Sequence, residues 1–438
     1  MSGSVWHPMS GYDPQDRRTV MVSGDGVWVT DDAGRRYLDA KSGLWCVNAG
    51  YGRDELAEVA REQLRTLPYY PLTDAHLPAL RLGEKLGEWL GGGYVFFFSN
   101  SGSEANEVAF KIARQYHQQA GEPYRWKIIS RYRAYHGQTP GALAATGQNE
   151  RRYGYEPLPG GFVHVAPPDP YRCHLCEGAC SLRCAAEVER VIGWELPETV
   201  AAVIAEPVIS GGGVIVPPDG YLAAVAGSCA RSGALLIVDE AICGFGRTGR
   251  RFGYEHSGIT PDIVTMAKAV ANGYFPLAVT AVRREIHERF AATGYGRLRH
   301  INTFGGHPAG CAVALRTMEI MDREELPRRA AESGAALAGR LKALSALPHV
   351  GDVRGLGLLA GIELVADRAS RRPVGADVTR RVVAACRDRG VIVGMNAGTA
   401  AGLANVIMIG PPLIAREDEL DLIATTLEEA LQAVPPPG

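Results

Sequence analysis

The sequence has 438 residues, of which 46% are hydrophobic and 21% are charged. This length predicts about two to three folding units with a large core, and the composition excludes a disordered or fibrous chain. The 46 basic and 48 acidic residues leave a formal net charge of −2, which lacks the electrostatic footprint of a nucleic-acid-binding protein and favours small molecules as partners.

The start of the chain shows no basic region followed by an apolar core, and no run of about 18 apolar residues occurs in the sequence. We therefore expect a cytoplasmic protein without a membrane span. The nine cysteines are then expected to be reduced thiols.

Residues 1–74 are expected to form an N-terminal arm that contributes to a small domain, with a helix from Asp54 to just before Pro68. Residues 75–310 alternate short apolar runs with amphipathic helices. Runs that are apolar throughout are typical of strands covered on both faces, so this segment predicts a large α/β domain with a mostly parallel sheet.

Residues 311–438 predict a smaller α+β domain. Its pattern begins with a long helical stretch to about Leu344 and continues with a Gly-containing apolar run. A second helix near residues 378–390 and a final helix before the proline-rich end complete it.

The first apolar run with chemistry at its end is YVFFF, which leads into SNSGSEANE at residues 99–107. At a strand-to-helix turn the first helical amides lack partners and the helix dipole attracts negative charge. Gly102 and Ser103 are therefore candidates for binding a phosphate. The alternative is a simple helix cap at Ser101 or Ser103.

A second apolar run, ALLIVDE at residues 234–240, ends in Asp239 and Glu240. A buried carboxylate needs a partner, and a protonated pyridine nitrogen would be one, because an ionised Asp keeps such a ring able to absorb carbanion charge. The alternative is a structural Asp in a local ion pair.

A third apolar run, DIVTMAK, ends in Lys268, in a chain that holds only six lysines. Desolvation among small, apolar neighbours favours the neutral amine, which can form a Schiff base as an arginine cannot. Lys41 is the credible rival. The remaining four lysines lie on polar helix faces or at a strand start: Lys85, Lys111, Lys127 and Lys342.

Two further motifs suggest other chemistry. GFGRTG at residues 244–249 matches a dinucleotide fingerprint, but FGYEHSGITPD follows it where a helix should begin, which favours a Gly-rich turn. Four clustered thiols could bind zinc or an iron–sulfur cluster, but their spacing matches no standard pattern, and we expect free thiols and no metal. These thiols belong to Cys173, Cys176, Cys180 and Cys184.

Six fragments together resemble class III aminotransferases, which belong to the fold-type I pyridoxal-phosphate enzymes. They are SNSGSEANE, YRAYHG (132–137), AEPV (205–208), VDEAICGFGRTG (238–249), MAK (266–268) and NTFGGHP (302–308). Similarity at SGLWCVNAGYGR (42–53) and LPYYP (67–71) points to the omega-amino-acid:pyruvate branch, with taurine:pyruvate and β-alanine:pyruvate aminotransferases as the most similar kinds.

This resemblance implies a fold-type I α/β fold and pyridoxal 5′-phosphate as the cofactor. Gly102 and Ser103 would bind its phosphate, Tyr135 would stack on its ring with His136 beside it, and Asp239 would pair with its ring nitrogen. Lys268 would hold it as a Schiff base and carry the proton during amino transfer. Glu206 would support the site from the neighbouring strand.

The resemblance also implies a homodimer with shared active sites, in which Thr303 reaches the phosphate of the partner subunit, although a tetramer stays open. Trp45 would line the substrate pocket. Without the resemblance, Tyr135 and Trp45 could be core aromatics and Thr303 a turn residue.

Two departures from the family pattern leave the substrate open. Ala241 replaces the usual valine two residues after the ring-nitrogen aspartate, and residues 391–415 contain no Arg or Lys, with Met395 near the place where a carboxylate-binding arginine is expected. The hypothesis is amino transfer from a taurine- or β-alanine-like amine to a keto acid. The alternatives are an aminomutase or racemase on the same scaffold, or a non-catalytic cofactor-binding protein.

Overall fold

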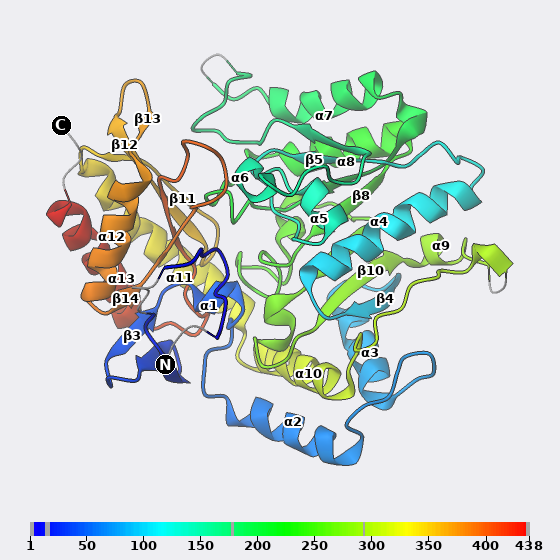
Figure 1. Ribbon diagram of the computed structural model, residues 1–438, viewed down its shortest axis with the longest axis horizontal. Helices are drawn as coiled ribbons and strands as arrows, with labels where there is room; N and C mark the ends of the chain where they lie inside the picture. Colours follow the sequence, from blue (N-terminus) through cyan, green and yellow to red (C-terminus); the bar gives the residue numbers. More distant parts are fainter. Residues whose placement is uncertain (1–3, 14–17, 177–178, 292–293, 435–438) are drawn as a thin grey trace.

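The computed structural model describes residues 4–13, 18–176, 179–291 and 294–434. Within these residues the strands form one large sheet and two smaller sheets, and helices pack around them (Figure 1). No helix in the described part of the chain is long and apolar enough to cross a membrane.

The large sheet has seven strands in the order β4-β10-β9-β8-β7-β5-β6. All neighbours are parallel except β10, which runs antiparallel to both β4 and β9, so the prediction of a mostly parallel sheet is confirmed. The strands are β4 (Tyr94–Ser99), β5 (Lys127–Arg131), β6 (Phe162–Val165), β7 (Val200–Ala205), β8 (Leu235–Asp239), β9 (Ile263–Met266) and β10 (Ala278–Arg283).

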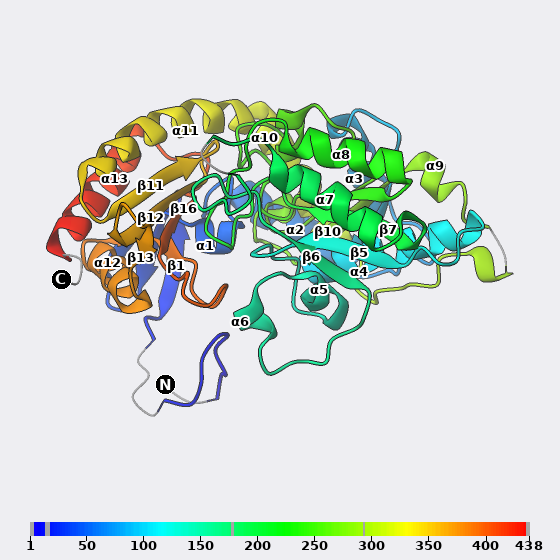
Figure 2. The same ribbon diagram turned by 90° about the horizontal axis from the view of Figure 1, so that it is seen from above.

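Both faces of this sheet are buried, which explains the unbroken apolar runs. Along β8, Leu236 and Val238 belong to one buried cluster and Ile237 to another, as the two-residue period of a strand requires. In Figure 2 helices lie on both faces of this sheet, with one pair on one side and another pair on the opposite side. The first pair is α7 (Arg183–Trp194) and α8 (Tyr221–Ser232), and the second is α4 (Gly102–Gln119) and α5 (Pro140–Ala145).

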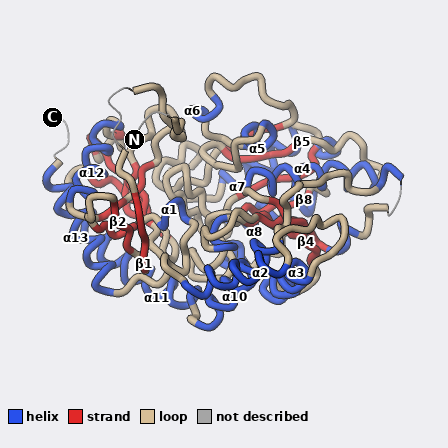
Figure 3. Tube along the Cα trace, turned by 60° about the horizontal axis from the view of Figure 1, so that its bottom comes forward, coloured by secondary structure: helices blue, strands red, loops and turns tan. Residues whose placement is uncertain are grey.

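One of the two smaller sheets joins the beginning of the chain to its end (Figure 3). The strand β14 (Val391–Ile392) pairs in parallel with β3, so the N-terminal strands lie beside the C-terminal segment. The first sheet also contains β1 (Met21–Asp25), β2 (Trp28–Asp31) and β3 (Arg36–Asp39). The second contains β11 (Val350–Gly355), β12 (Ala360–Asp367), β13 (Arg372–Pro373), β15 (Gly394–Met395) and β16 (Val406–Ile409). The division of the chain at residues 74 and 310 stays a prediction.

The long helical stretch expected up to about Leu344 is divided into two helices. Glu325 adopts a left-handed conformation with φ 50°, and Pro327 then occupies the first turn of the next helix, where its missing N–H costs nothing. The helices are α10 (Pro308–Arg323) and α11 (Leu326–Lys342). The other helices of the described chain are α1 (Ser42–Trp45), α2 (Asp54–Thr66), α3 (Leu77–Trp89), α6 (Asn149–Arg152), α9 (Arg284–His287), α12 (Ala376–Asp388) and α13 (Glu417–Ala433).

The topology brings the carboxyl ends of β4, β7, β8 and β9 to one edge of the large sheet. Because β10 is antiparallel to both neighbours, β4 runs in the same direction as β9, β8 and β7. The segments that follow these strands therefore meet where ligands bind in open α/β sheets.

Replacing Gly334 by alanine should destabilise the protein. A Cβ at this position of α11 would meet the backbone of Gly357 in the turn between β11 and β12, which cannot move aside as a flexible side chain would. We expect a loss of about 1–3 kcal/mol, seen as a lower midpoint of thermal unfolding. Gly339→Ala in the same helix is the control, since no atom lies within 4 Å of its Cβ position, and helix propensity should make it neutral or stabilising. Equal effects of the two substitutions would contradict the packing.

Candidate active site

A cavity of about 190 Å³ lies at this edge of the large sheet. Seven of the residues predicted for the site line it: Gly102, Ser103, Tyr135, His136, Glu206, Asp239 and Lys268. Its other lining residues are Asn106, Gly137, Ala241 and Ile242. Trp45 and Thr303 are not among the lining residues.

Asp239 at the end of β8 is buried and held by three donors. Its Oδ2 accepts a hydrogen bond of 2.8 Å from the side chain of Asn106 and lies 2.9 Å from Nδ1 of His136, while its Oδ1 accepts from the amide of Ala241. An ionised carboxylate only accepts hydrogen bonds, so Nδ1 of His136 is the donor. Asn106 is itself fixed, because its Oδ1 accepts from the hydroxyl of Thr265 in β9.

These contacts keep Asp239 ionised inside the protein. Burial alone would raise the pKa of Asp239, but the hydrogen bond and charge of His136, with the hydrogen bond from Asn106, outweigh burial and hold the pKa below its ordinary value. The cavity therefore contains a negative charge that a protonated ring nitrogen would complement.

The first turn of α4 forms another part of the cavity wall. Ser101 caps the helix, because its hydroxyl accepts from the amide of Glu104, and the helix itself provides no acceptor for the amides of Gly102 and Ser103. The hydroxyl of Ser103 accepts from the amide of Gln138, which ties α4 to the segment after Tyr135. The cap at Ser101 therefore leaves the amides of Gly102 and Ser103 available for an anion, whose binding there stays a prediction.

Glu206 fixes the backbone of Tyr135 without reaching a charged partner. Its carboxylate accepts from the amides of Tyr135 at 3.0 Å and Ser210 at 3.3 Å, and burial raises its pKa. The next acid, Glu240, directly follows β8. It accepts hydrogen bonds from the amides of Gly253 and Tyr254, and burial raises its pKa to about 8. Of Asp239 and Glu240, Asp239 alone lines the cavity.

Lys268 follows β9 and is partly buried. It adopts φ 53°, a left-handed conformation that is uncommon for a residue with a side chain. The turn is fixed by Asn272, whose side chain accepts from the amide of Ala49 and donates to the carbonyl of Gly50. The surrounding structure thus holds Lys268 in a sparsely populated backbone conformation at the cavity wall.

Trp45 and Thr303 lie outside the cavity. Trp45 packs in a buried apolar cluster that also includes Ile242, which does line the cavity. Thr303 is exposed, and its carbonyl accepts a hydrogen bond of 2.7 Å from the hydroxyl of Tyr69. Their expected roles stay predictions.

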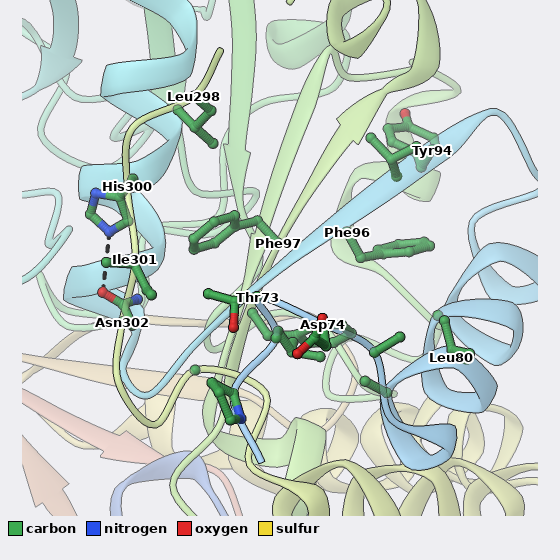
Figure 4. Close-up of a pocket in the computed structure, with 18 of the residues that line it drawn as sticks. Thr73, Asp74, Leu80, Tyr94, Phe96, Phe97, Leu298, His300, Ile301 and Asn302 are labelled. Atoms are coloured by element: carbon green, nitrogen blue, oxygen red, sulfur yellow. Dashed lines mark hydrogen bonds between the residues drawn. The ribbon is translucent and has the colours of Figure 1, made fainter. Parts of the chain in front are cut away.

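A larger hollow, of about 1170 Å³, is lined by β4, α3 and residues 297–302 (Figure 4). Phe96 and Phe97 line it, and Nε2 of His300 lies 3.1 Å from Oδ1 of Asn302. It contains none of the predicted site residues. The smaller cavity, where the polar groups converge, is therefore the candidate active site.

Comparison with known proteins identifies the family. The family model described as "Aminotransferase class-III" matches residues 12–431. An uncharacterized aminotransferase of Bacillus subtilis is 57% identical, over 98% of this chain and 95% of that protein. The chain belongs to the class III aminotransferases.

Two further relatives of this class III aminotransferase extend the comparison. A hypotaurine/taurine–pyruvate aminotransferase of Paracoccus denitrificans is 41% identical, over 98% of this chain and 95% of that protein. A solved aminotransferase of Bacillus anthracis is 52% identical and has a TM-score of 0.96, with 98% of this chain and 96% of that chain covered.

Class III aminotransferases use pyridoxal 5′-phosphate, which is therefore the cofactor of this chain. The cavity fits this group in its chemistry. It offers an ionised carboxylate for a protonated ring nitrogen, a helix N-terminus for a phosphate, a primary amine for the aldehyde carbon and a tyrosine ring for stacking.

The two other motifs do not join this site. GFGRTG forms a turn in which Arg247 binds the carbonyls of Leu358 and Pro411 and the side chains of Ser42 and Asn48, so it serves packing. All nine cysteines are free thiols, and within the described residues no three His, Cys, Asp or Glu side chains are placed to hold a metal. That the clustered cysteines bind no metal stays a prediction.

Replacing Asn106 by leucine should lower the free energy of unfolding at neutral pH. The lost hydrogen bond to an ionised carboxylate costs about 1.5–3 kcal/mol. The pKa of Asp239 in the folded protein lies below the value of about 3.9 that it has in the unfolded chain. The loss of stability should therefore be complete above about pH 3.9. It should shrink only as the pH falls through the pKa of the folded protein. The midpoints of thermal unfolding of wild type and variant, compared at pH values from 8 downward, measure this loss of stability.

Thr265→Val is the matched control, since it removes only the hydrogen bond to Oδ1 of Asn106 and leaves the carboxylate's donors in place. We expect a smaller loss, of about 0.5–1.5 kcal/mol, without an effect on the titration of Asp239. A difference between wild type and Asn106→Leu that disappears between pH 6 and 8 would show that Asp239 is not held ionised.

Proposed function

We propose that this class III aminotransferase moves the amino group of a short omega-amino acid, such as taurine or β-alanine, to a keto acid such as pyruvate. The observation that carries the proposal is the convergence of Asp239, Lys268, Tyr135 and the first turn of α4 on one cavity. The 41% identical hypotaurine/taurine–pyruvate aminotransferase supports the choice of donor and acceptor.

Each lining residue has a distinct role in this proposal. The amides and hydroxyl of Gly102 and Ser103 bind the phosphate, and Asp239, positioned by His136 and Asn106, keeps the ring nitrogen protonated. The protonated ring supplies an electron sink for charge that develops on the substrate carbon. Glu206 acts as a positioning residue, because it holds the backbone of Tyr135 so that the ring can stack on the cofactor.

Lys268 has two tasks. Its amine would hold the cofactor covalently, and when it is free the same nitrogen would carry the proton that amino transfer moves from the substrate carbon. Its left-handed backbone conformation holds the residue at the cavity wall. Ala241, which also lines the cavity, leaves more room beside the ring than a valine would.

The proposed assembly is a homodimer with shared active sites. Several large apolar side chains are exposed near the hollow beside β4, which a second copy of the chain would cover. They are Tyr69, Tyr70, Leu72, Leu77, Leu80, Ile301 and Phe304. Thr303 lies in the same surface, from which it would reach the partner's phosphate. A tetramer built from two such dimers stays open, and the cytoplasmic location stays a prediction.

Lys268→Ala should abolish amino transfer because no other group in the cavity can both hold the cofactor and carry the proton. The variant should keep its fold, read from its circular dichroism and melting temperature, while the turnover number falls by several orders of magnitude. Borohydride treatment of wild type, followed by peptide mass mapping, should find the cofactor on Lys268. Cofactor trapped on Lys41, or full activity of the variant, would refute the assignment.

Subunit mixing tests the shared site. Thr303→Asp should be inactive, because a carboxylate repels the partner's phosphate, and Lys268→Ala is inactive for the reason above. In mixed dimers the site that holds Lys268 receives Thr303 from the other subunit, so mixing should restore up to about a quarter of wild-type activity. Light scattering should give twice 46.9 kDa. No recovery in mixtures that demonstrably contain mixed dimers would mean that Thr303 does not act across the interface.

A further inference from the structure

The acid group of an omega-amino acid needs a cation that residues 391–415 do not supply. Met395 lies in β15 where a basic residue was expected, and the loop that follows reaches β16 without a positive charge. A substrate carboxylate or sulfonate left without a donor would lose most of its binding energy. The structure offers a cation at a different place in the same region.

Arg151, in the short helix α6, does not line the cavity but contacts a residue that does. Its guanidinium carbon is 5.2 Å from the centre of the Tyr135 ring, and that ring lines the cavity. Its Nε donates to Oε1 of Gln148 at 2.7 Å, while the side-chain Nε2 of Gln148 donates to the carbonyl of Arg133 at 3.0 Å. The charge is thereby held against a residue of the candidate active site.

The same helix touches the loop that follows Met395. The amide of Glu150 lies 3.3 Å from the carbonyl of Thr399, so Arg151 is adjacent to the segment in which the missing arginine was expected. The Nη1 of Arg151 also lies 3.4 Å from the sulfur of Met9 in the N-terminal segment, and sulfur is a weak acceptor. Three segments therefore meet around this guanidinium.

Arg151 is partly exposed, and among the described residues no carboxylate lies within 4.0 Å of it. The neighbouring arginines are engaged differently. Arg133 pairs with buried Asp169, Arg354 with buried Glu363, and Arg152 with Glu156. Arg151 thus keeps N–H donors for an anion at a site that water can reach.

Lys41 is the rival cation. Its side chain packs against Gly394 in β15, with Cδ 3.8 Å from the place of a Cβ there. No described contact connects Lys41 with a residue that lines the cavity, whereas Arg151 stacks on one. An ammonium is also a point charge, while a guanidinium offers two parallel donors to a carboxylate or sulfonate.

We propose that Arg151 binds the carboxylate or sulfonate group of the substrate beside Tyr135 and so selects short amines that carry an acid group. This inference rests on the proposed function for the identity of the reaction. Its geometry places the acid group on the side of Tyr135 where α6, the loop after Met395 and the N-terminal segment meet.

The test measures binding and turnover separately in the holoenzyme. Propanoate and ethanesulfonate carry the two acid groups but no amine, and calorimetry gives their dissociation constants. Arg151→Met should weaken the binding of at least one of them about tenfold or more, and Arg151→Lys should restore part of it. With propylamine, a donor that has no acid group, Arg151→Met should lose far less kcat/KM than it loses with β-alanine.

Arg152→Met is the matched control, because the neighbouring arginine pairs with Glu156, and it should bind both anions as wild type does. The proposal is overturned if wild type binds neither anion, if Arg151→Met binds both normally, if Lys41→Met alone weakens them, or if propylamine turnover falls as much as anion binding. Anion binding that depends on Arg151 in a protein that converts no amine would support this site and reject the proposed function, so the two can fail independently.

Discussion

The buried negative charge of Asp239 is the constraint on which the site depends. A carboxylate at the end of a central strand is stable only if donors surround it, and these donors come from three separate parts of the chain. Asn106 belongs to α4, His136 follows β5, and Ala241 follows β8 itself. Satisfying one charge therefore fixes the first turn of α4, the segment of Tyr135 and the end of β8 relative to one another.

The same constraint extends to the neighbouring strand. Asn106 can orient its amide toward Asp239 because Thr265 of β9 donates to its oxygen, and β9 leads directly into Lys268. On the other side, Glu206 follows β7 and holds the amide of Tyr135. The carboxylate of Asp239, the ring of Tyr135 and the amine of Lys268 thus line one cavity, because a hydrogen-bonded network joins the ends of β7, β8 and β9.

Much of this could be predicted from the sequence because its signals are local. The apolar runs that lead to Gly102, Asp239 and Lys268 indicate strands covered on both faces. The scarcity of lysine reduces the candidates for the Schiff-base amine to two. The fold-type I architecture and the mostly parallel sheet were confirmed. The family resemblance added Tyr135, His136 and Glu206, which the structure brings to the same cavity.

Other features could not be predicted because their partners are far apart in the sequence. Asn106 and Thr265 are separated by 159 positions, and neither is unusual in its local pattern, although a polar residue on the apolar face of α4 is a signal that could have been used. The break at Glu325 depends on one backbone conformation. Arg151 carries no sequence signal, because its stacking on Tyr135 follows from the fold and not from a motif.

The most direct test of amino transfer is a single half-reaction. Purified holoenzyme is mixed with taurine or β-alanine alone, and the cofactor's absorption and the released aldehyde are followed. We expect one aldehyde per active site and a stable change in the spectrum, which should reverse with formation of alanine when pyruvate is added. Continued turnover of the amine without a keto acid, or no spectral change with any amine, would contradict it.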